Sequence, residues 1–284
     1  MSPLLFNLVV DVFTRMLSKA ATQGLIGGLL TDMIEGGIVS LQYADDIILF
    51  LKNNLIQANH FKWLLACFEN LSRMRINYNK NDLITMNVTD EDKTALARTF
   101  CCNIGDFPIK YLGVPLHFIK LKREDIQPVV DKLLKRISGW KGRLLSSAGR
   151  LTLLKSCLAS IPIYLLSVIK FPKWAIENIN SQMANFLWND QEGNHRYHLS
   201  NWQSIAQKKE YGGWGILDLV CLNMSLLSSW INIYHLSDNM IWKQIIDYKY
   251  RTKQPNLFCC PEIGASPFWR GVLWASKAAQ LGVR

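Results

Sequence analysis

The chain has 284 residues, of which 49% are hydrophobic, enough for one large or two modest cores. Its formal net charge of +10 suits a polyanionic partner such as nucleic acid, although many basic proteins bind none. The seven cysteines are odd in number and form no C-x-x-C pair, so we expect reduced thiols, no disulfide partner and an intracellular protein.

No secretory signal, membrane partner or zinc site is expected. The first apolar stretch contains Asp11 and Arg15, which a signal peptide would not. The longest apolar run, 158–169, is too short to span a membrane and is broken by Pro162. The pairs His195/His198 and Cys259/Cys260 are too far apart in sequence for a compact zinc finger, and we expect them to be ordinary packing residues.

The N-terminus has the pattern of a helix that ends near Gly24. Ser2 can serve as N-cap and Pro3 as the first helical residue. One broad apolar stripe follows, and we expect most of it to pack into a core. Its members are Leu4, Leu5, Leu8, Val9, Val12, Phe13, Met16 and Leu17.

Residues 38–51 predict a buried hairpin with two acids at its turn. Two apolar arms of strand length flank Asp45 and Asp46. Adjacent carboxylates between apolar strands are costly unless a cation compensates them, and Mg²⁺ prefers such hard oxygen ligands. Alternatively, the turn lies in water and the two Asp are ordinary turn residues. From the pattern alone the two interpretations weigh about equally.

A second helix is predicted over about 55–73. Its inward face is expected to hold Phe61, Leu64, Leu65, Phe68 and Leu71. Lys80 follows this helix, and from the pattern alone it is at least as readily a solvated surface lysine as a binding residue. Gly113, before Val114-Pro115, predicts a turn.

Positive charge dominates from residue 110 to residue 155. The basic side chains are Lys110, Lys120, Lys122, Arg123, Lys132, Lys135, Arg136, Lys141, Arg143, Arg150 and Lys155, against Glu124, Asp125 and Asp131. An amphipathic helix is predicted here, with Ile126, Val129, Val130, Leu133, Leu134 and Ile137 inward. Lys132, Lys135 and Arg136 lie off that stripe and could meet phosphates, or form a solvated face. Ser147 is expected to cap a second helix carrying Leu151, Leu154 and Leu158.

The rest of the chain reads as mainly helical. Helices are predicted over 172–188, 219–235, 239–250 and 267–281, the last capped by Ser266, and residues 189–215 are loop-rich. Gly212-Gly213 predicts a turn. We expect the tryptophans of this half to be core residues rather than stacking platforms for bases. They are Trp174, Trp188, Trp202, Trp214, Trp230, Trp242, Trp269 and Trp274.

Four short blocks resemble reverse transcriptases. Tyr43-Ala44-Asp45-Asp46 with its apolar arms resembles the catalytic hairpin, in the variant of non-LTR (LINE-type) retrotransposons. The palm helix that precedes this hairpin resembles MSPLLFNL at 1–8. The segment after the next helix resembles INYNK at 76–80, and the palm–thumb hairpin resembles PIKYLGVPL at 108–116. A looser resemblance to plant elements extends to the C-terminus.

The resemblance implies roles for particular residues. Asp45 and Asp46 would be catalytic and hold Mg²⁺ or Mn²⁺ for two-metal nucleotidyl transfer. Nucleotide-binding residues would be Ser2, Pro3, Tyr43, Ala44 and Lys80. Nucleic-acid-binding residues would be Gly113, Lys132, Lys135, Arg136, Lys141 and Arg143. The implied partners are an RNA template and a DNA primer, in the nucleus or cytoplasm.

The chain departs from the family pattern at its start, because the strand with the other metal-binding aspartate would lie upstream of Met1. We therefore expect a truncated, inactive fragment with an exposed sheet edge and marginal solubility. The expected fold class is α+β: a partial palm at 1–117 with a small antiparallel sheet, a helical thumb at 118–190 and a helical Trp-rich region at 191–284. Two alternatives are a non-catalytic basic RNA- or DNA-binding protein and a helical protein whose hairpin merely packs.

Overall fold

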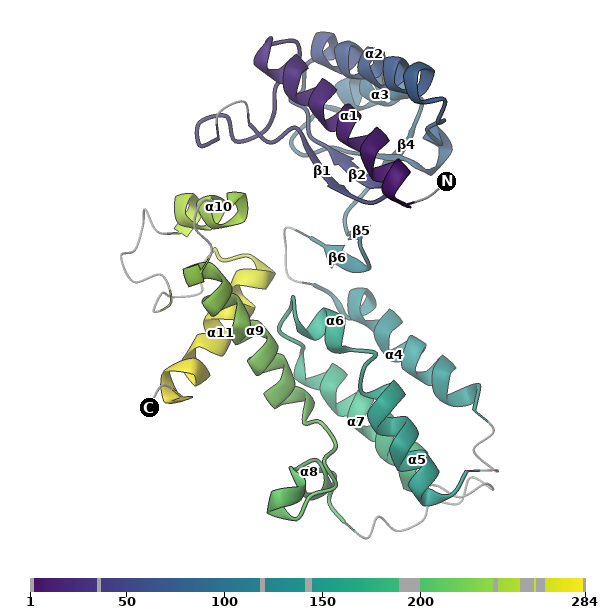
Figure 1. The fold of residues 1–284 in the computed structure, drawn as a ribbon, viewed down its shortest axis with the longest axis vertical. Coiled ribbons are helices and arrows are strands. Elements are labelled where there is room, and N and C mark those ends of the chain that lie inside the picture. Colours follow the sequence, from purple (N-terminus) through teal and green to yellow (C-terminus); the bar gives the residue numbers. More distant parts are fainter. Residues whose placement is uncertain are drawn as a thin grey trace. The chain divides into compact units, whose positions relative to one another are not determined.

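The computed structural model describes residues 3–34, 37–117, 121–140, 145–188, 200–236, 240–250, 258 and 264–282. The chain divides into two compact units, an N-terminal unit Met1–Leu112 and a C-terminal unit Gly113–Arg284. Helices dominate and the strands are short, which confirms the predicted α+β class (Figure 1). The predicted division at residues 117 and 190 stays a prediction.

The N-terminal unit combines three helices with short strands. Its elements are α1 (Pro3–Thr22), β1 (Ser40–Tyr43), β2 (Asp46–Leu49), α2 (Leu55–Ser72), the 3₁₀ turn η1 (Tyr78–Lys80), β3 (Asp82–Ile84), α3 (Asp90–Phe100), β4 (Asn103–Gly105) and β5 (Ile109–Tyr111). Helix α2 starts where Asn54 accepts hydrogen bonds from the N–H groups of Ile56 and Gln57. Helix α3 starts in the same way at Thr89.

One core holds this unit together. It joins α1, the hairpin arms, α2 and α3. The buried members are Phe13, Leu17, Ala20, Ile26, Val39, Ala58, Phe61, Leu65, Phe68, Leu96 and Phe100. These helices lie on the same side of the β1–β2 hairpin in Figure 1.

The expected packing of α1 and α2 is wrong in part. Leu4, Leu5, Leu8 and Val12 are exposed, because the core-facing side of α1 is the one that carries Val10, Phe13 and Leu17. Leu71, near the end of α2, is also exposed, whereas Phe61, Leu65 and Phe68 of the same helix are buried. The apolar stripe of α1 is therefore wider than the face that other elements of the unit cover.

The strands form separate pairs rather than one sheet. β1 and β2 are antiparallel, as predicted. β3 and β4 are parallel, with Asp82 opposite Asn103, and helix α3 makes the connection between them. No local pattern in the sequence predicts this parallel pair, whose strands are three residues each.

The C-terminal unit is helical after one short strand. Its elements are β6 (Val114–Leu116), α4 (Arg123–Ser138), α5 (Ser147–Leu153), the π-helical turn η3 (Leu154–Leu158), α6 (Ile163–Leu166), α7 (Lys173–Trp188), α8 (Trp202–Ile205), the 3₁₀ turn η4 (Lys209–Tyr211), α9 (Leu219–Leu236), α10 (Ile241–Tyr250) and α11 (Pro267–Gly282). Ser146, not Ser147, caps α5, since its side chain accepts from the N–H of Gly149. Ser266 caps α11 as predicted.

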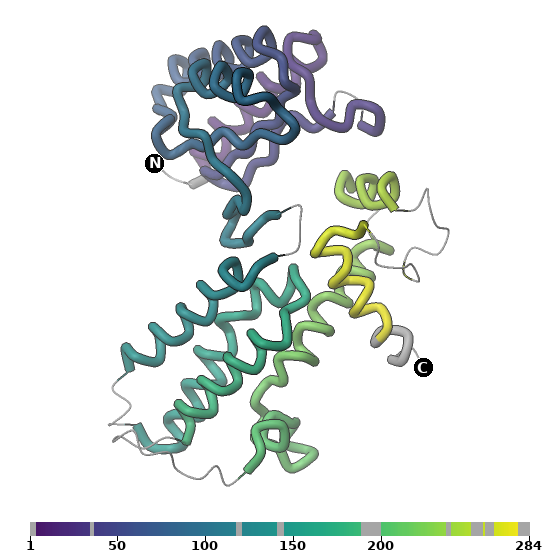
Figure 2. Tube along the Cα trace, turned by 180° about the vertical axis from the view of Figure 1, so that it is seen from behind, coloured from purple at the N-terminus to yellow at the C-terminus, as the bar shows by residue number. Residues whose placement is uncertain are grey.

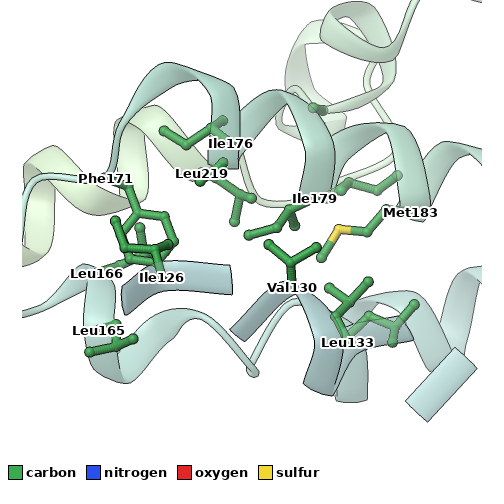
Figure 3. Close-up of a cluster of buried hydrophobic side chains, with 14 of the residues drawn as sticks. Ile126, Val130, Leu133, Leu165, Leu166, Phe171, Ile176, Ile179, Met183 and Leu219 are labelled. Carbon is green, nitrogen blue, oxygen red and sulfur yellow. The ribbon is translucent and has the colours of Figure 1, made fainter. Parts of the chain in front are cut away.

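The main core of this unit lies between α4, η3 and α7. In Figure 3, Val130 and Leu133 of α4 face Ile179 and Met183 of α7. The predicted inward stripe of α4 is confirmed at Ile126, Val130 and Leu133 and wrong at Leu134, which is exposed.

Helix α9 docks on the segment after α6 through a buried amide. Asn223 donates through Nδ2 to the carbonyls of Leu166 and Ile169, at 2.6 and 2.9 Å, and its Oδ1 accepts from the N–H of Phe171 at 3.0 Å. Trp230 adds a bond from its indole N–H to the carbonyl of Ser167 at 2.8 Å. Backbone groups that leave the helix at α6 thus find their partners on α9.

Helices α9 and α11 pack together and carry a second, aromatic core with α10 (Figure 2). Trp269 is buried there and its ring is stacked on that of Tyr250, with centroids 5.4 Å apart. By length and composition, α9 is apolar enough to cross a membrane, but a core helix meets the same criteria. Only 22% of this stretch is buried in the protein: Asn223 and Leu227 are fully buried, whereas Val220, Ile233 and Leu236 are exposed.

Candidate active site

The two acids lie at the end of the β1–β2 hairpin. Tyr43 pairs directly with Asp46, so Ala44 and Asp45 form the two-residue turn. Ala44 has φ 51°, a left-handed conformation that costs a residue with a Cβ roughly 1–2 kcal/mol. Such backbone strain persists where surrounding structure imposes it, and functional turns are a common setting.

The hairpin has an inner and an outer face because side chains alternate along a strand. Gln42 and Ile47 are opposite each other, and Gln42 accepts a hydrogen bond from Thr14 of α1 at 3.0 Å, which defines the inner face. Tyr43 and Asp46 therefore project from the outer face, where the Tyr43 side chain is 64% exposed.

Both acids are exposed, so the expectation of a buried hairpin is wrong at its tip. Only the base of the hairpin enters the core, through Val39 and Leu49. Within the described ranges, neither Asp45 nor Asp46 forms an ion pair with a lysine or arginine. The two carboxylates therefore remain available to a cation or a solvated ligand.

The chemistry of these donors fits one Mg²⁺ better than two. A Mg²⁺ ion accepts one or two carboxylates and completes its shell with waters or phosphates. In the part of the chain that the structure describes, no group of three or more Asp, Glu, His or Cys side chains could hold a metal. A two-metal site would need a further carboxylate beside Asp45 and Asp46.

Lys80 ends the η1 turn and its side chain is exposed. Glu69 of α2 holds this turn by accepting hydrogen bonds from the N–H of Ile76 and the phenol of Tyr78. The sequence pattern alone does not single out Glu69. No contact between Lys80 and the hairpin acids is seen among the described residues. Its predicted role near the phosphates of a nucleotide stays a prediction.

The remaining predicted residues are scattered. Gly113 has φ 81° and forms, with Leu112, the turn between β5 and β6, as the sequence predicts. Pro3 is the first residue of α1. Ser2, Lys141 and Arg143 lie outside the described residues.

Helix α4 presents cations along one flank. Lys132, Lys135 and Arg136 are exposed and follow the helical spacing of three and four residues, so they share one side. Asp131, one turn before Lys135 on the same helix, accepts a hydrogen bond from Gln127 at 3.0 Å. No ion pair to the three cations occurs in the described ranges.

Residues 1–116 match the family model of the reverse transcriptase (RNA-dependent DNA polymerase). This part of the chain is reverse transcriptase-like. The match includes the hairpin with Asp45 and Asp46, Lys80 and Gly113, and ends before α4. The reverse transcriptase-like segment therefore carries the acids, while the basic flank of α4 lies beyond it.

A curated relative extends the similarity. An Arabidopsis thaliana protein, named as a ribonuclease H protein, is 26% identical over 157 residues, which is 54% of this chain and 25% of the relative. The chain thus spans about a quarter of the length of the relative it matches.

Proposed function

We propose that this chain is the palm and thumb part of a plant-like, LINE-type retrotransposon polymerase that copies an RNA template onto a DNA primer. The observation that carries the proposal is the exposed Asp45-Asp46 pair at the tip of a two-stranded hairpin, with Tyr43 opposite. The reverse transcriptase match over the same residues and the relative named as a ribonuclease H protein support a retrotransposon setting.

In this proposal each residue acts by binding or orienting. Asp45 and Asp46 supply oxygen ligands to Mg²⁺ or Mn²⁺, which, when bound, neutralises phosphate charge and eases deprotonation of a hydroxyl. Tyr43 and Ala44 border the nucleotide on the outer face, and Lys80 adds a cation for its phosphates. Most of the rate in such a transfer comes from positioning and charge stabilisation.

We further propose that the isolated chain extends no primer. Asp45 and Asp46 bind one cation weakly, and the described residues offer no third carboxylate to hold a second. Loss of a bridging ligand in a two-metal site removes several orders of magnitude in rate, about 4 kcal/mol or more of barrier. Nuclear or cytoplasmic localisation follows from the proposed substrates.

Manganese binding and primer extension test these statements separately. Electron paramagnetic resonance should detect weak Mn²⁺ binding that Asp45→Asn removes and that the control Asp32→Asn, in an exposed loop, retains. Primer extension on an RNA template with Mg²⁺ should give no product. If Asp45→Asn leaves Mn²⁺ binding unchanged, the polymerase proposal is contradicted. If the chain extends a primer and Asp45→Asn abolishes that extension, only the proposed inactivity is contradicted.

A second candidate function, non-catalytic binding of RNA or DNA, is favoured by the cation flank of α4. Lys132, Lys135 and Arg136 are exposed on one side and form no ion pair within the described ranges. Such side chains contact phosphates without reading bases. This function needs no metal and stands even where the hairpin binds none.

A further inference from the structure

Residues 207–215, between α8 and α9, form a turn that combines an exposed aromatic ring with lysines. We refer to them as the aromatic-basic turn. The Tyr211 side chain is 74% exposed, and Lys208 and Lys209 beside it are also exposed. The chain enters from Ala206 and leaves to Ile216, both of which are buried in the main core of the C-terminal unit. The sequence predicted a turn here without any chemistry.

The turn is held in one shape by its own backbone. Trp214 donates to the carbonyl of Ile205 and Gly215 to that of Gln207, each at 2.9 Å. Gly213 donates to Lys208 at 3.1 Å and lies so close that a Cβ on it would stand 2.2 Å from the Gln207 oxygen. Glycine is therefore required at this close approach.

A side chain from η3 also helps to hold the aromatic-basic turn in place. Lys155, in η3, donates from its ammonium to the carbonyl of Trp214. The Trp214 ring lies 5.3 Å from that of Trp188, which anchors the end of the turn on α7. A ring displayed on an ordered turn loses little conformational entropy when a ligand stacks on it.

The chemistry of the turn matches a nucleotide of a single strand. A base stacks on an aromatic face whatever its identity, and lysines meet the phosphates on either side. In a duplex, bases are already stacked on one another, so an exposed ring does not reach their faces. An acidic peptide would contact the lysines but would leave the exposed Tyr211 ring without a stacking partner.

We propose that the aromatic-basic turn binds single-stranded nucleic acid, with a base stacked on Tyr211 and neighbouring phosphates contacted by Lys208 and Lys209. This contact goes beyond the polymerase proposal, because no residue of the hairpin takes part in it. It also differs from the flank of α4, which offers cations without an exposed ring.

Fluorescence anisotropy with the full chain tests the proposal. The probes are labelled oligo(U) RNA, oligo(dT) DNA and a blunt-ended RNA duplex made of two strands. Tyr211→Ala should weaken binding of both single strands by about 5- to 150-fold and leave duplex binding unchanged. Tyr211→Phe, which keeps the ring, should bind like the original chain. Lys208→Ala with Lys209→Ala should lower the log–log salt slope by about 1.4.

The controls separate this proposal from the others. Tyr248→Ala removes another exposed tyrosine of the C-terminal unit and should leave binding unchanged. Single-strand binding that is unaffected by Tyr211→Ala, or reduced equally by Tyr211→Phe, would overturn the stacking contact. Mn²⁺ binding at Asp45 should be the same in Tyr211→Ala and the original chain. The effect of Tyr211→Ala on single-strand binding can therefore be interpreted even if the polymerase proposal fails.

Discussion

The phenol of Tyr78 donates a hydrogen bond to Oε2 of Glu69 at 3.2 Å. The other oxygen of the same carboxylate accepts from the N–H of Ile76 at 2.7 Å. The ammonium of Lys62 lies 3.7 Å from the centroid of the Tyr78 ring. Helix α2 therefore holds the segment that leads to Lys80 with a carboxylate and a cation, and any contact that Lys80 makes depends on them.

This arrangement predicts a loss of stability at high pH. Burial first, and then the charge of Glu69, raise the pKa of Tyr78 from 10.0 to about 12. Below pH 10 the folded and unfolded states both keep the proton, so the contribution is fully present. Between pH 10 and 12 the unfolded state releases it first, and the stability that Tyr78 contributes is lost. Urea midpoints should fall across this window by more in the original chain than in Tyr78→Phe. Parallel profiles would contradict the prediction.

A second prediction concerns the buried amide on α9. Asn223→Ala leaves two carbonyls and the N–H of Phe171 without their buried partner. We expect a loss of about 3–4 kcal/mol in the free energy of unfolding, measured by urea denaturation. Asn232→Ala, at an exposed position of the same helix, should stay within about 0.5 kcal/mol. Equal effects of the two substitutions would show that the amide does not fix α9.

Local signals explain which elements the sequence could predict. Ser266 and the apolar spacing that follows it define α11 without reference to the rest of the chain, and the hairpin follows from two apolar arms around Asp45-Asp46. Asn223 sits within an apolar run, and nothing local reveals that its partners lie 52–57 residues earlier. The parallel β3–β4 pair was missed for the same reason.

The site was predictable to a similar extent. The adjacency of Asp45 and Asp46 indicates a turn with two carboxylates, and the structure has them at the hairpin tip. Whether they are buried or exposed stays open from the sequence, because exposure depends on what covers the outer face rather than on the strand pattern. Tyr211 was missed because one aromatic residue beside two lysines carries no periodic signal; the crowding of Gly213 becomes visible only in three dimensions.

A third prediction concerns the outer face of α1. Leu5 and Leu8 are 54% and 67% exposed, so polar replacements remove little buried surface. Leu5→Gln with Leu8→Gln should change the free energy of unfolding by less than about 0.5 kcal/mol per site and reduce aggregation in light scattering. Phe13→Ala, in the core, should cost about 3–5 kcal/mol. A large loss from the double glutamine variant would mean that this face is packed in solution.

The fourth prediction concerns the basic flank of α4. Replacing Lys132, Lys135 and Arg136 together by Ala should weaken binding to RNA and DNA of any sequence, because these side chains meet phosphates rather than bases. On a duplex, the log–log slope of affinity against salt should fall by about 0.9 per lost phosphate contact, hence about 2.7 for three. The unfolding free energy should stay within about 0.5 kcal/mol per site, since all three side chains are exposed.

The matched control for α4 is Lys173→Ala. Lys173 is equally exposed, but its ammonium lies 3.5 Å from the carboxylate of Glu177 one turn later on α7, so its charge is already compensated. We expect it to leave the salt slope unchanged. If Lys173→Ala and the α4 variant lowered the slope per charge by the same amount, binding would reflect the net charge of +10 rather than a surface on α4. A slope that changes only with α4 would locate the phosphate contacts on that helix.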